Sequence, residues 1–200
     1  MSRPRVACLI SGGGSNMLAL VNAMQSKGYA EPALVISNQV QAAGLQKADS
    51  LGVTTACVPH KARSKEDFEA ELLEALQSAQ IDLLCLAGFM RVLSAEFVAS
   101  WAGRMLNIHP SLLPKYPGLN THARALEAGD VLHGCTVHEV IPELDAGPIL
   151  GQAQVKIEPS DTPNTLAQKV LVWEHKLYPV VLERHINGHK EPFFMNSAAQ

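Results

Sequence analysis

The segment MLNIHPSLLP, residues 105–114, runs from an apolar strand directly into a loop that contains several prolines. Side chains alternate between the two faces of a strand, so Asn107 and His109 are predicted to project to the same side. Pro110, Pro114 and Pro117 restrict φ and favour extended neighbours, which predicts a stiff loop over residues 110–117, the proline loop. A side-chain amide beside an imidazole can stabilise an oxyanion and move protons, as at an active-site corner. The alternative, a structural Asn and His that end a strand, stays open on this segment alone.

Upstream of this segment, short apolar runs alternate with amphipathic stretches. The predicted strands are 5–10, 32–37, 53–58 and 81–87, and the predicted helices are 15–26, 42–51, 64–79 and 94–101. This alternation indicates crossover connections and a parallel sheet with helices on both faces. Ligands of such sheets bind beyond the carboxyl ends of the strands, where the loops that follow the strands are expected to meet.

Downstream the rhythm changes. The predicted elements are a helix at 121–129, alternating runs at 134–141 and 148–157, and a final helix at 162–187. The two runs have no helix between them and predict an antiparallel pair, while Pro179 is expected to kink the last helix. The sequence after Pro192 shows no period. We therefore expect an α/β fold with a mostly parallel twisted sheet, as one domain over residues 1–190 followed by a tail at 191–200.

The composition is that of an ordinary globular protein. The 200 residues are 47% hydrophobic with a formal net charge of −3, and Lys and Arg form no run. A nucleic-acid partner is therefore disfavoured, whereas small anionic substrates remain compatible. We also expect a cytoplasmic protein without a membrane partner, because neither a signal peptide nor a membrane-spanning run is present. The cysteines stand singly and indicate neither a disulfide framework nor a zinc site: Cys8, Cys57, Cys85 and Cys135.

A glycine loop, residues 11–16 (SGGGSN), follows the first strand and precedes a helix. Successive backbone amides and a helix N-terminus favour a phosphate group there. The loop lacks the Gly-Lys-Ser/Thr of a P-loop and the full dinucleotide fingerprint, so a small phosphate monoester is the better candidate ligand. The other interpretation is a tight strand-to-helix turn without a ligand.

Three further features each allow a functional and a non-functional interpretation. Asp145 lies in a turn bounded by glycine and proline, where it could orient a histidine or simply face solvent. Glu174, in an apolar helix, could bind ligand hydroxyls or lie on a solvated face. His133, Cys135 and His138 lie close together, but Cys135 and His138 face opposite sides of a strand, which disfavours a metal site.

Several motifs together resemble the folate-dependent formyltransferase family, over nearly the whole chain. They are residues 107–118 (NIHPSLLPKYPG), 144–148 (LDAGP), 11–16, 87–91 (AGFMR), Glu174-His175 and Tyr178-Pro179. The resemblance implies a single-domain Rossmann-like fold. It also implies transfer of a formyl group from 10-formyltetrahydrofolate to the amine of glycinamide ribonucleotide, in purine biosynthesis, by a monomer or homodimer without a metal.

The resemblance also implies site residues. Catalytic roles fall to Asn107, His109 and Asp145. Substrate binding falls to Gly14, Ser15 and Asn16 for the phosphate and to Glu174 for the ribose. The folate would contact Lys65, Met90, Arg91, Val92, Leu93, Asn107, Ile141, Pro142, Glu143, Leu144 and Asp145.

In the implied chemistry, Asn107 and a protonated His109 donate to the oxyanion, and Asp145 keeps the imidazole charged. Four positions depart from the family pattern: Lys65, where Arg is frequent, Gly13 for Asn, Asn120 for His and Ala146 for Gly. The rival functions are a formyltetrahydrofolate deformylase, a methionyl-tRNA formyltransferase and a non-catalytic phosphate-binding module. The first two would be expected to have additional domains.

Overall fold

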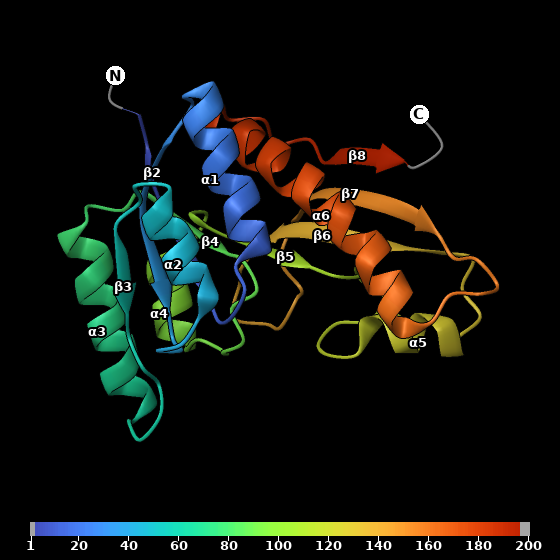
Figure 1. Ribbon diagram of the computed structural model, residues 1–200, viewed down its shortest axis with the longest axis horizontal. Coiled ribbons are helices and arrows are strands. Elements are labelled where there is room, and N and C mark those ends of the chain that lie inside the picture. The colour runs from blue at the N-terminus through green and yellow to red at the C-terminus, as the bar shows by residue number, and fades with distance from the viewer. Residues whose placement is uncertain (1–2, 197–200) are drawn as a thin grey trace. The chain divides into compact units, whose positions relative to one another are not determined.

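The computed structural model describes residues 3–196 and divides the chain into two compact units (Figure 1). The first unit extends to Leu106 and the second begins at Asn107, so the division falls inside β5 (Met105–His109). Within the described residues, no helix is both long and apolar enough to cross a bilayer.

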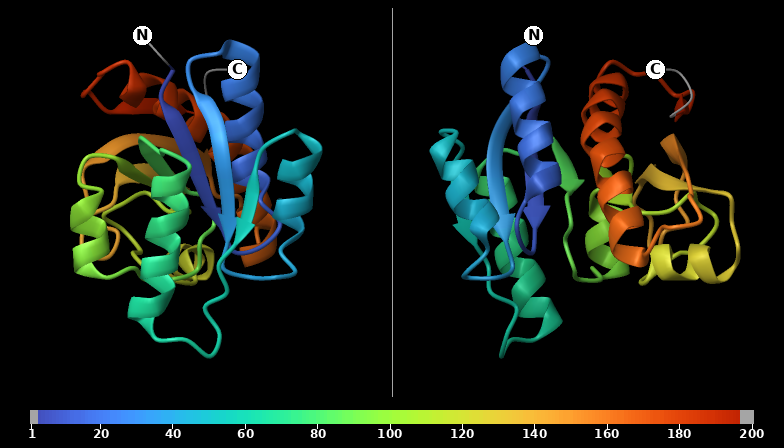
Figure 2. Two further views of the ribbon diagram at one scale, coloured as in Figure 1. Left: turned by 90° about the vertical axis from the view of Figure 1, so that its left-hand side faces the viewer. Right: turned by 45° about the vertical axis from the view of Figure 1, so that its right-hand side comes forward.

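The first unit contains four parallel strands in the order β3-β2-β1-β4. The strands are β1 (Arg5–Ile10), β2 (Glu31–Ser37), β3 (Thr55–Cys57) and β4 (Leu83–Leu86). The helices are α1 (Ser15–Lys27), α2 (Ala43–Ser50), α3 (Lys65–Ser78) and α4 (Ala95–Ser100). Helices α1 and α2 cover one face of these strands, and α3 and α4 cover the other (Figure 2). The predicted parallel arrangement with helices on both faces is therefore confirmed in this unit.

The local sequence explains where these elements begin. All four residues of β4 are buried, as expected of a strand covered on both faces. The hydroxyl of Ser64, the first residue of the helix predicted at 64–79, caps α3 by accepting from the Asp67 amide at 3.0 Å. Neither Ser15 nor Asn16 caps α1, although both are good capping residues: the N-cap is Gly14 in a left-handed conformation, without a side-chain cap.

The second unit contains β5 followed in order by β6, β7 and β8. Its remaining elements are α5 (Thr121–Glu127), β6 (Leu132–Glu139), β7 (Ile149–Lys156), α6 (Pro163–Ile186) and β8 (Phe193–Asn196). Strands β6 and β7 are antiparallel, which confirms the predicted pair, and β8 runs parallel to β7. Helix α6 packs on β6 and β7 and buries its apolar stripe there.

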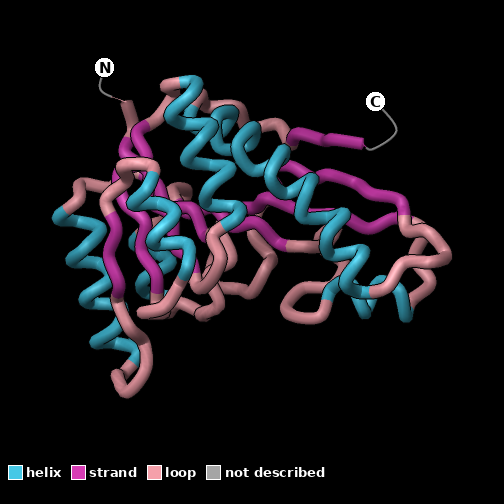
Figure 3. The backbone as a smooth tube through the Cα atoms, in the orientation of Figure 1, coloured by secondary structure: helices cyan, strands magenta, loops and turns pink. Residues whose placement is uncertain are grey.

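Helix α6 begins at the start of the helix predicted at 162–187, and Thr162 is its side-chain cap, followed by Pro163 in the first turn. Figure 3 shows one continuous helix, and Pro179 lies inside it. Pro179 is itself buried, and packing on the strands holds the helix together where the proline removes one backbone hydrogen bond.

The sequence missed β8, whose four residues have too little pattern to stand out. This strand forms by backbone pairing, with Phe193 opposite Gly151 of β7. The third predicted strand, 53–58, is also shorter than expected, at Thr55–Cys57. The end of the predicted tail, residues 197–200, and residues 1–2 of the predicted domain lie outside the described residues.

Candidate active site

Asn107 and His109 lie at the end of β5 in the second unit. The two polar residues alternate with Leu106 and Ile108, which are buried on the other side of the strand. His109 is itself only 5% exposed, and Asn107 is half-buried. The strand therefore places an amide and an imidazole side by side at its end, as the alternation predicts.

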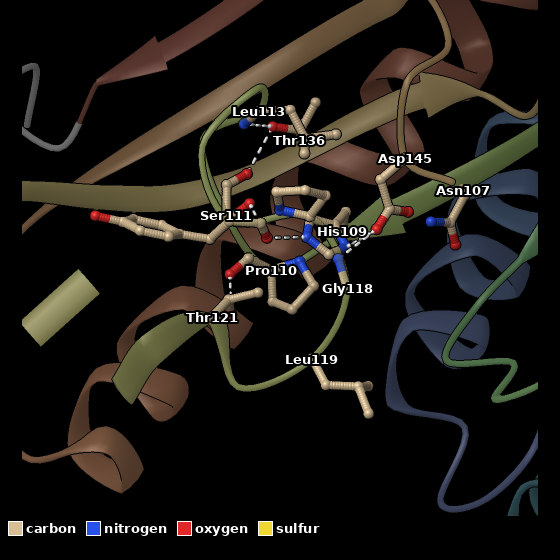
Figure 4. Close-up of polar contacts among 12 residues, drawn as sticks. Asn107, His109, Pro110, Ser111, Leu113, Gly118, Leu119, Thr121, Thr136 and Asp145 are labelled. Carbon is tan, nitrogen blue, oxygen red and sulfur yellow. Dashed lines mark hydrogen bonds and ion pairs between the residues drawn. The ribbon is translucent and has the colours of Figure 1, made fainter. Parts of the chain in front are cut away.

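Both nitrogens of the His109 ring face acceptors of the protein (Figure 4). Nε2 donates to the carbonyl oxygen of Tyr116 at 2.9 Å, and Nδ1 lies 3.4 Å from Oδ2 of Asp145. A carbonyl oxygen can only accept, so Nε2 carries the hydrogen of this bond. Nε2 is thus occupied by the Tyr116 carbonyl, whereas Nδ1 lies at ion-pair distance from the Asp145 carboxylate.

Asp145 is held in the turn between β6 and β7. Its backbone is left-handed, at φ 51°, a conformation that Asp tolerates better than most residues. Oδ2 accepts from the amide of Gly118 at 2.8 Å, and the side chain is 8% exposed, so the carboxylate does not face solvent. A Cβ at Gly147 would lie 1.9 Å from the Glu139 carbonyl oxygen, so only glycine fits this close turn.

His138 joins Asn107 to Asp145. Its Nδ1 donates to the Glu139 carbonyl at 2.9 Å, and its Nε2 lies 3.1 Å from Nδ2 of Asn107 and 3.6 Å from Oδ1 of Asp145. Burial lowers the pKa of His138, which keeps the ring neutral at neutral pH. Nε2 therefore accepts a hydrogen bond from the Asn107 amide and fixes its orientation.

In the sequence, His138 was considered only as a candidate metal ligand, and its contact with Asn107 was not predicted. The contact joins β5 to β6 through residues 31 positions apart, which no local pattern reveals. The other members of the weighed metal group lie elsewhere: Cys135 is fully buried, and His133 Nε2 lies 3.0 Å from His122 Nδ1. Residues 3–196 contain no group of three or more side chains placed to bind a metal.

The outer side of the proline loop is covered by a polar cluster around Tyr116. The Tyr116 hydroxyl donates to Asp130 at 2.8 Å, and the Lys115 ammonium pairs with the same carboxylate at 2.7 Å. These hydrogen bonds, that from Lys115 first, lower the pKa of Asp130. Nearby, burial lowers the pKa of His133 to about 4, so this ring is neutral beside its partner His122.

In the first unit the glycine loop surrounds a cavity of about 320 Å³. The cavity is lined by residues 11–16 together with Ala87, Gly88 and Met90. The amide of Ser11 donates to the Gly88 carbonyl at 3.1 Å, and the Met90 amide donates to the Ser11 hydroxyl at 2.7 Å. The loops that follow β1 and β4 are therefore adjacent in this unit, as expected of loops that follow parallel strands.

The other predicted site residues lie in several settings. Lys65 is the first residue of α3, and Met90 and Val92 have side chains that are 69% exposed. Leu93 is nearly buried, Leu144 is 61% exposed, and Glu174 is 7% exposed on α6. Arg91 is exposed after β4, and residues 141–143 precede Leu144 in the turn between β6 and β7.

Comparison with known proteins identifies the family. The model of the formyl transferase family matches residues 4–182. Phosphoribosylglycinamide formyltransferase of Escherichia coli is 43% identical over 187 residues, which cover 92% of this chain and 87% of that protein. The chain belongs to the formyl transferase family, as its motifs indicate.

A second kind of relative is much longer. The trifunctional purine biosynthetic protein adenosine-3 of Drosophila melanogaster is 49% identical over 190 residues, or 93% of this chain. The chain spans only 14% of the length of that protein.

Solved structures confirm the fold class. Phosphoribosylglycinamide formyltransferase from Brucella melitensis superposes with a TM-score of 0.89 at 51% identity, over 92% of this chain and 96% of that one. The enzyme from Coxiella burnetii gives a TM-score of 0.88 at 46% identity, over 94% and 89% of the two chains. The predicted mostly parallel, Rossmann-like α/β fold with an antiparallel pair is therefore correct.

Proposed function

We propose that the protein transfers the formyl group of 10-formyltetrahydrofolate to the amine of glycinamide ribonucleotide, giving formylglycinamide ribonucleotide and tetrahydrofolate. The observation that carries the proposal is the cluster of Asn107, His138, Asp145 and His109 in a chain of the formyl transferase family. Relatives of similar length from E. coli and Haemophilus influenzae, at 43% and 41% identity, are named for this reaction.

The proposal includes the wider expectations from the sequence. We assign the activity to a domain at residues 1–190, with 191–200 as a tail, acting in the cytoplasm on small molecules as a monomer or homodimer. The proposed chemistry uses no metal, because an amide and an imidazolium stabilise the negative charge that develops on the formyl oxygen.

We assign Asn107 to the oxyanion. The substrate amine attacks the formyl carbon, a C–N bond forms, and the carbonyl oxygen becomes negatively charged. One hydrogen of the Asn107 amide is used by His138, and within residues 3–196 the other has no hydrogen-bond partner. His138 thus holds the amide while its second N–H stays available to the oxyanion.

His109 supplies positive charge and a route for the proton. Its Nε2 is held firmly by the Tyr116 carbonyl, whereas the 3.4 Å distance from Nδ1 to Asp145 is that of an ion pair rather than a close hydrogen bond. We therefore assign proton transfer to Nδ1. The charged ring donates its Nδ1 proton to N10 as the C–N10 bond breaks, and Nδ1 then takes the proton of the attacking amine, so the ring returns to its starting state while Asp145 orients it.

The remaining predicted residues bind the substrates. Backbone amides at Gly14, Ser15 and Asn16 would hold the phosphate, since they follow β1 at the start of a helix. Glu174 would bind the ribose hydroxyls. The folate would contact residues 141–145, Lys65 and the segment from Met90 to Leu93. An ammonium at Lys65 gives a single charge contact instead of the bidentate fork of Arg.

The test measures tetrahydrofolate release by purified protein from 10-formyltetrahydrofolate, with and without glycinamide ribonucleotide. We expect release that depends on the acceptor and yields one formylated product for each folate released. Release without acceptor would identify a deformylase, and no release in either case would indicate a binding module; both would overturn the proposal. Asp145→Asn should slow the acceptor-dependent reaction and leave the protein folded, as judged by circular dichroism.

A further inference from the structure

We propose that Thr136 of β6 and Gln152 of β7 are positioning residues for catalysis, which hold the proline loop so that the Tyr116 carbonyl stays on His109. The two side chains lie directly opposite each other in the antiparallel pair. Neither is among the residues implied by the family motifs. The inference rests on the proposed function, because it concerns the rate of that reaction.

The hydroxyl of Thr136 uses every hydrogen bond that it can make. It donates to the carbonyl of Ser111 at 2.6 Å and accepts from the amide of Leu113 at 3.1 Å (Figure 4). It also accepts from Nε2 of Gln152 at 3.0 Å. One donor and two lone pairs are thereby satisfied. The side chain is fully buried, so no solvent competes for these groups. The first turn of the proline loop is thus fixed at two backbone atoms.

Gln152 adds a third contact. Its Nε2 donates one hydrogen to Thr136 and the other to the carbonyl of Leu113 at 2.9 Å. The carbonyl can only accept, so the amide must present nitrogen and not oxygen to the loop. Together the two side chains bind the carbonyl of Ser111 and both backbone groups of Leu113.

Ser111 connects the hydrogen bonds of Thr136 and Gln152 to the imidazole of His109. Its side chain is fully buried, and its hydroxyl donates to the carbonyl of Lys115 at 2.7 Å and lies 3.3 Å from that of Tyr116. The Tyr116 carbonyl is the same atom that accepts from Nε2 of His109 at 2.9 Å. Each hydrogen bond in this series joins buried or half-buried groups, so a shift of the loop at residue 113 moves the acceptor of the imidazole.

The expected consequence is a change in rate rather than in binding. Asn107, Asp145 and the glycine loop make no hydrogen bond to Thr136 or Gln152, so substrate contacts remain when these two are changed. A displaced reacting group can cost about 100-fold in rate for a movement near 1 Å. We therefore expect loss in kcat with KM nearly unchanged.

The first experiment compares Thr136→Val with Thr136→Ser. Valine keeps the shape and removes the hydroxyl, whereas serine keeps the hydroxyl. We expect Thr136→Val to lower kcat by about 10- to 100-fold, with KM for both substrates within about threefold, and Thr136→Ser to stay within about threefold of wild type in kcat. Equal kcat in both variants would overturn the inference.

The second experiment uses a matched pair on β7. Gln152→Met removes both donors at similar volume. Gln154→Met makes the same change two residues along the same face, at a half-buried side chain with no side-chain hydrogen bond in the described part of the chain. We expect kcat to fall about 10-fold or more only for Gln152→Met. Equal effects of the two changes, or a lower melting temperature with unchanged kcat, would show a merely structural role.

A third measurement does not depend on activity. In the substrate-free protein, the ¹H–¹⁵N signal of Nε2–H in His109, assigned with His109→Gln, should be protected from solvent exchange in wild type and Gln154→Met. It should exchange faster in Thr136→Val and Gln152→Met. A wild-type protein without formyl transfer would refute the proposed function alone, whereas an unchanged His109 signal in both variants would refute the positioning role alone.

Discussion

The glycine loop of the first unit exposes its backbone to an open cavity, whereas the proline loop of the second unit is held from behind by buried side chains. At Gly13 an added Cβ would meet no atom within 4 Å, while Ser111 and Thr136 are fully buried. Binding a phosphate needs several amides that point into free space. Directing an imidazole needs a carbonyl that does not move, and that requires hydrogen bonds on the far side of the loop.

The largest expected effect tests the catalytic side of this comparison. Asn107→Ala and His109→Ala should each lower kcat by about 10²–10³-fold, because each removes a group assigned to the charge or the proton in the transition state. The measurement is single-turnover formyl transfer, with circular dichroism to show that the fold is retained. Near-normal rates in either folded variant would remove that residue from the chemistry.

The next effect concerns pH and the outer side of the proline loop. His133 has a pKa of about 4 in the folded protein, below its ordinary 6.5, so the unfolded chain binds more protons between these values. The contribution of His133 to the free energy of unfolding should be fully present above pH 6.5. It should fall as the pH drops toward 4, by at most about 3 kcal/mol.

Urea unfolding between pH 4 and 7 measures this dependence. Burial also lowers the pKa values of His122, His138 and His175, so they contribute in the same direction. His133→Asn should therefore reduce the slope without abolishing it. A slope equal to that of wild type would show that His133 is not the acid-sensitive group.

A smaller effect tests the glycine loop. Gly14 has φ 68°, and an added Cβ would lie 2.9 Å from Cε of Met17 and 3.0 Å from Cα of Gly44. Gly14→Ala should cost about 1–2 kcal/mol of stability, the price of a left-handed residue, and raise KM for glycinamide ribonucleotide more than it lowers kcat. The control is Gly13→Ala, which has free space and no positive φ. Similar KM values in the two variants would contradict the role of Gly14.

The smallest effect lies on the exposed rim of the proline loop. Lys115→Met removes an ion pair with Asp130 whose Lys side chain is 61% exposed. Such pairs contribute about 0.2–1 kcal/mol, so the melting temperature and kcat should barely change. A large fall in kcat would mean that the rim, and not the buried side, controls the loop.

Local sequence patterns were sufficient to predict most of the helices and strands. The alternation of apolar runs with helices predicted the parallel strands, and α3 and α6 begin within one residue of the predicted starts at 64 and 162. Strand alternation also put Asn107 and His109 on one side of β5. The strand β8 was missed because its stability comes from pairing with β7 and not from its own four residues.

The sequence by itself determined the elements and the two polar residues that end β5, because these depend on periodicities within a few residues. Only the tertiary structure decided that His138 holds Asn107, that Tyr116 presents its carbonyl to His109, and that Gln152 lies behind the loop. These contacts join residues up to 39 positions apart. They follow from strand register and from the way the loops pack on the strands, which the local sequence does not encode.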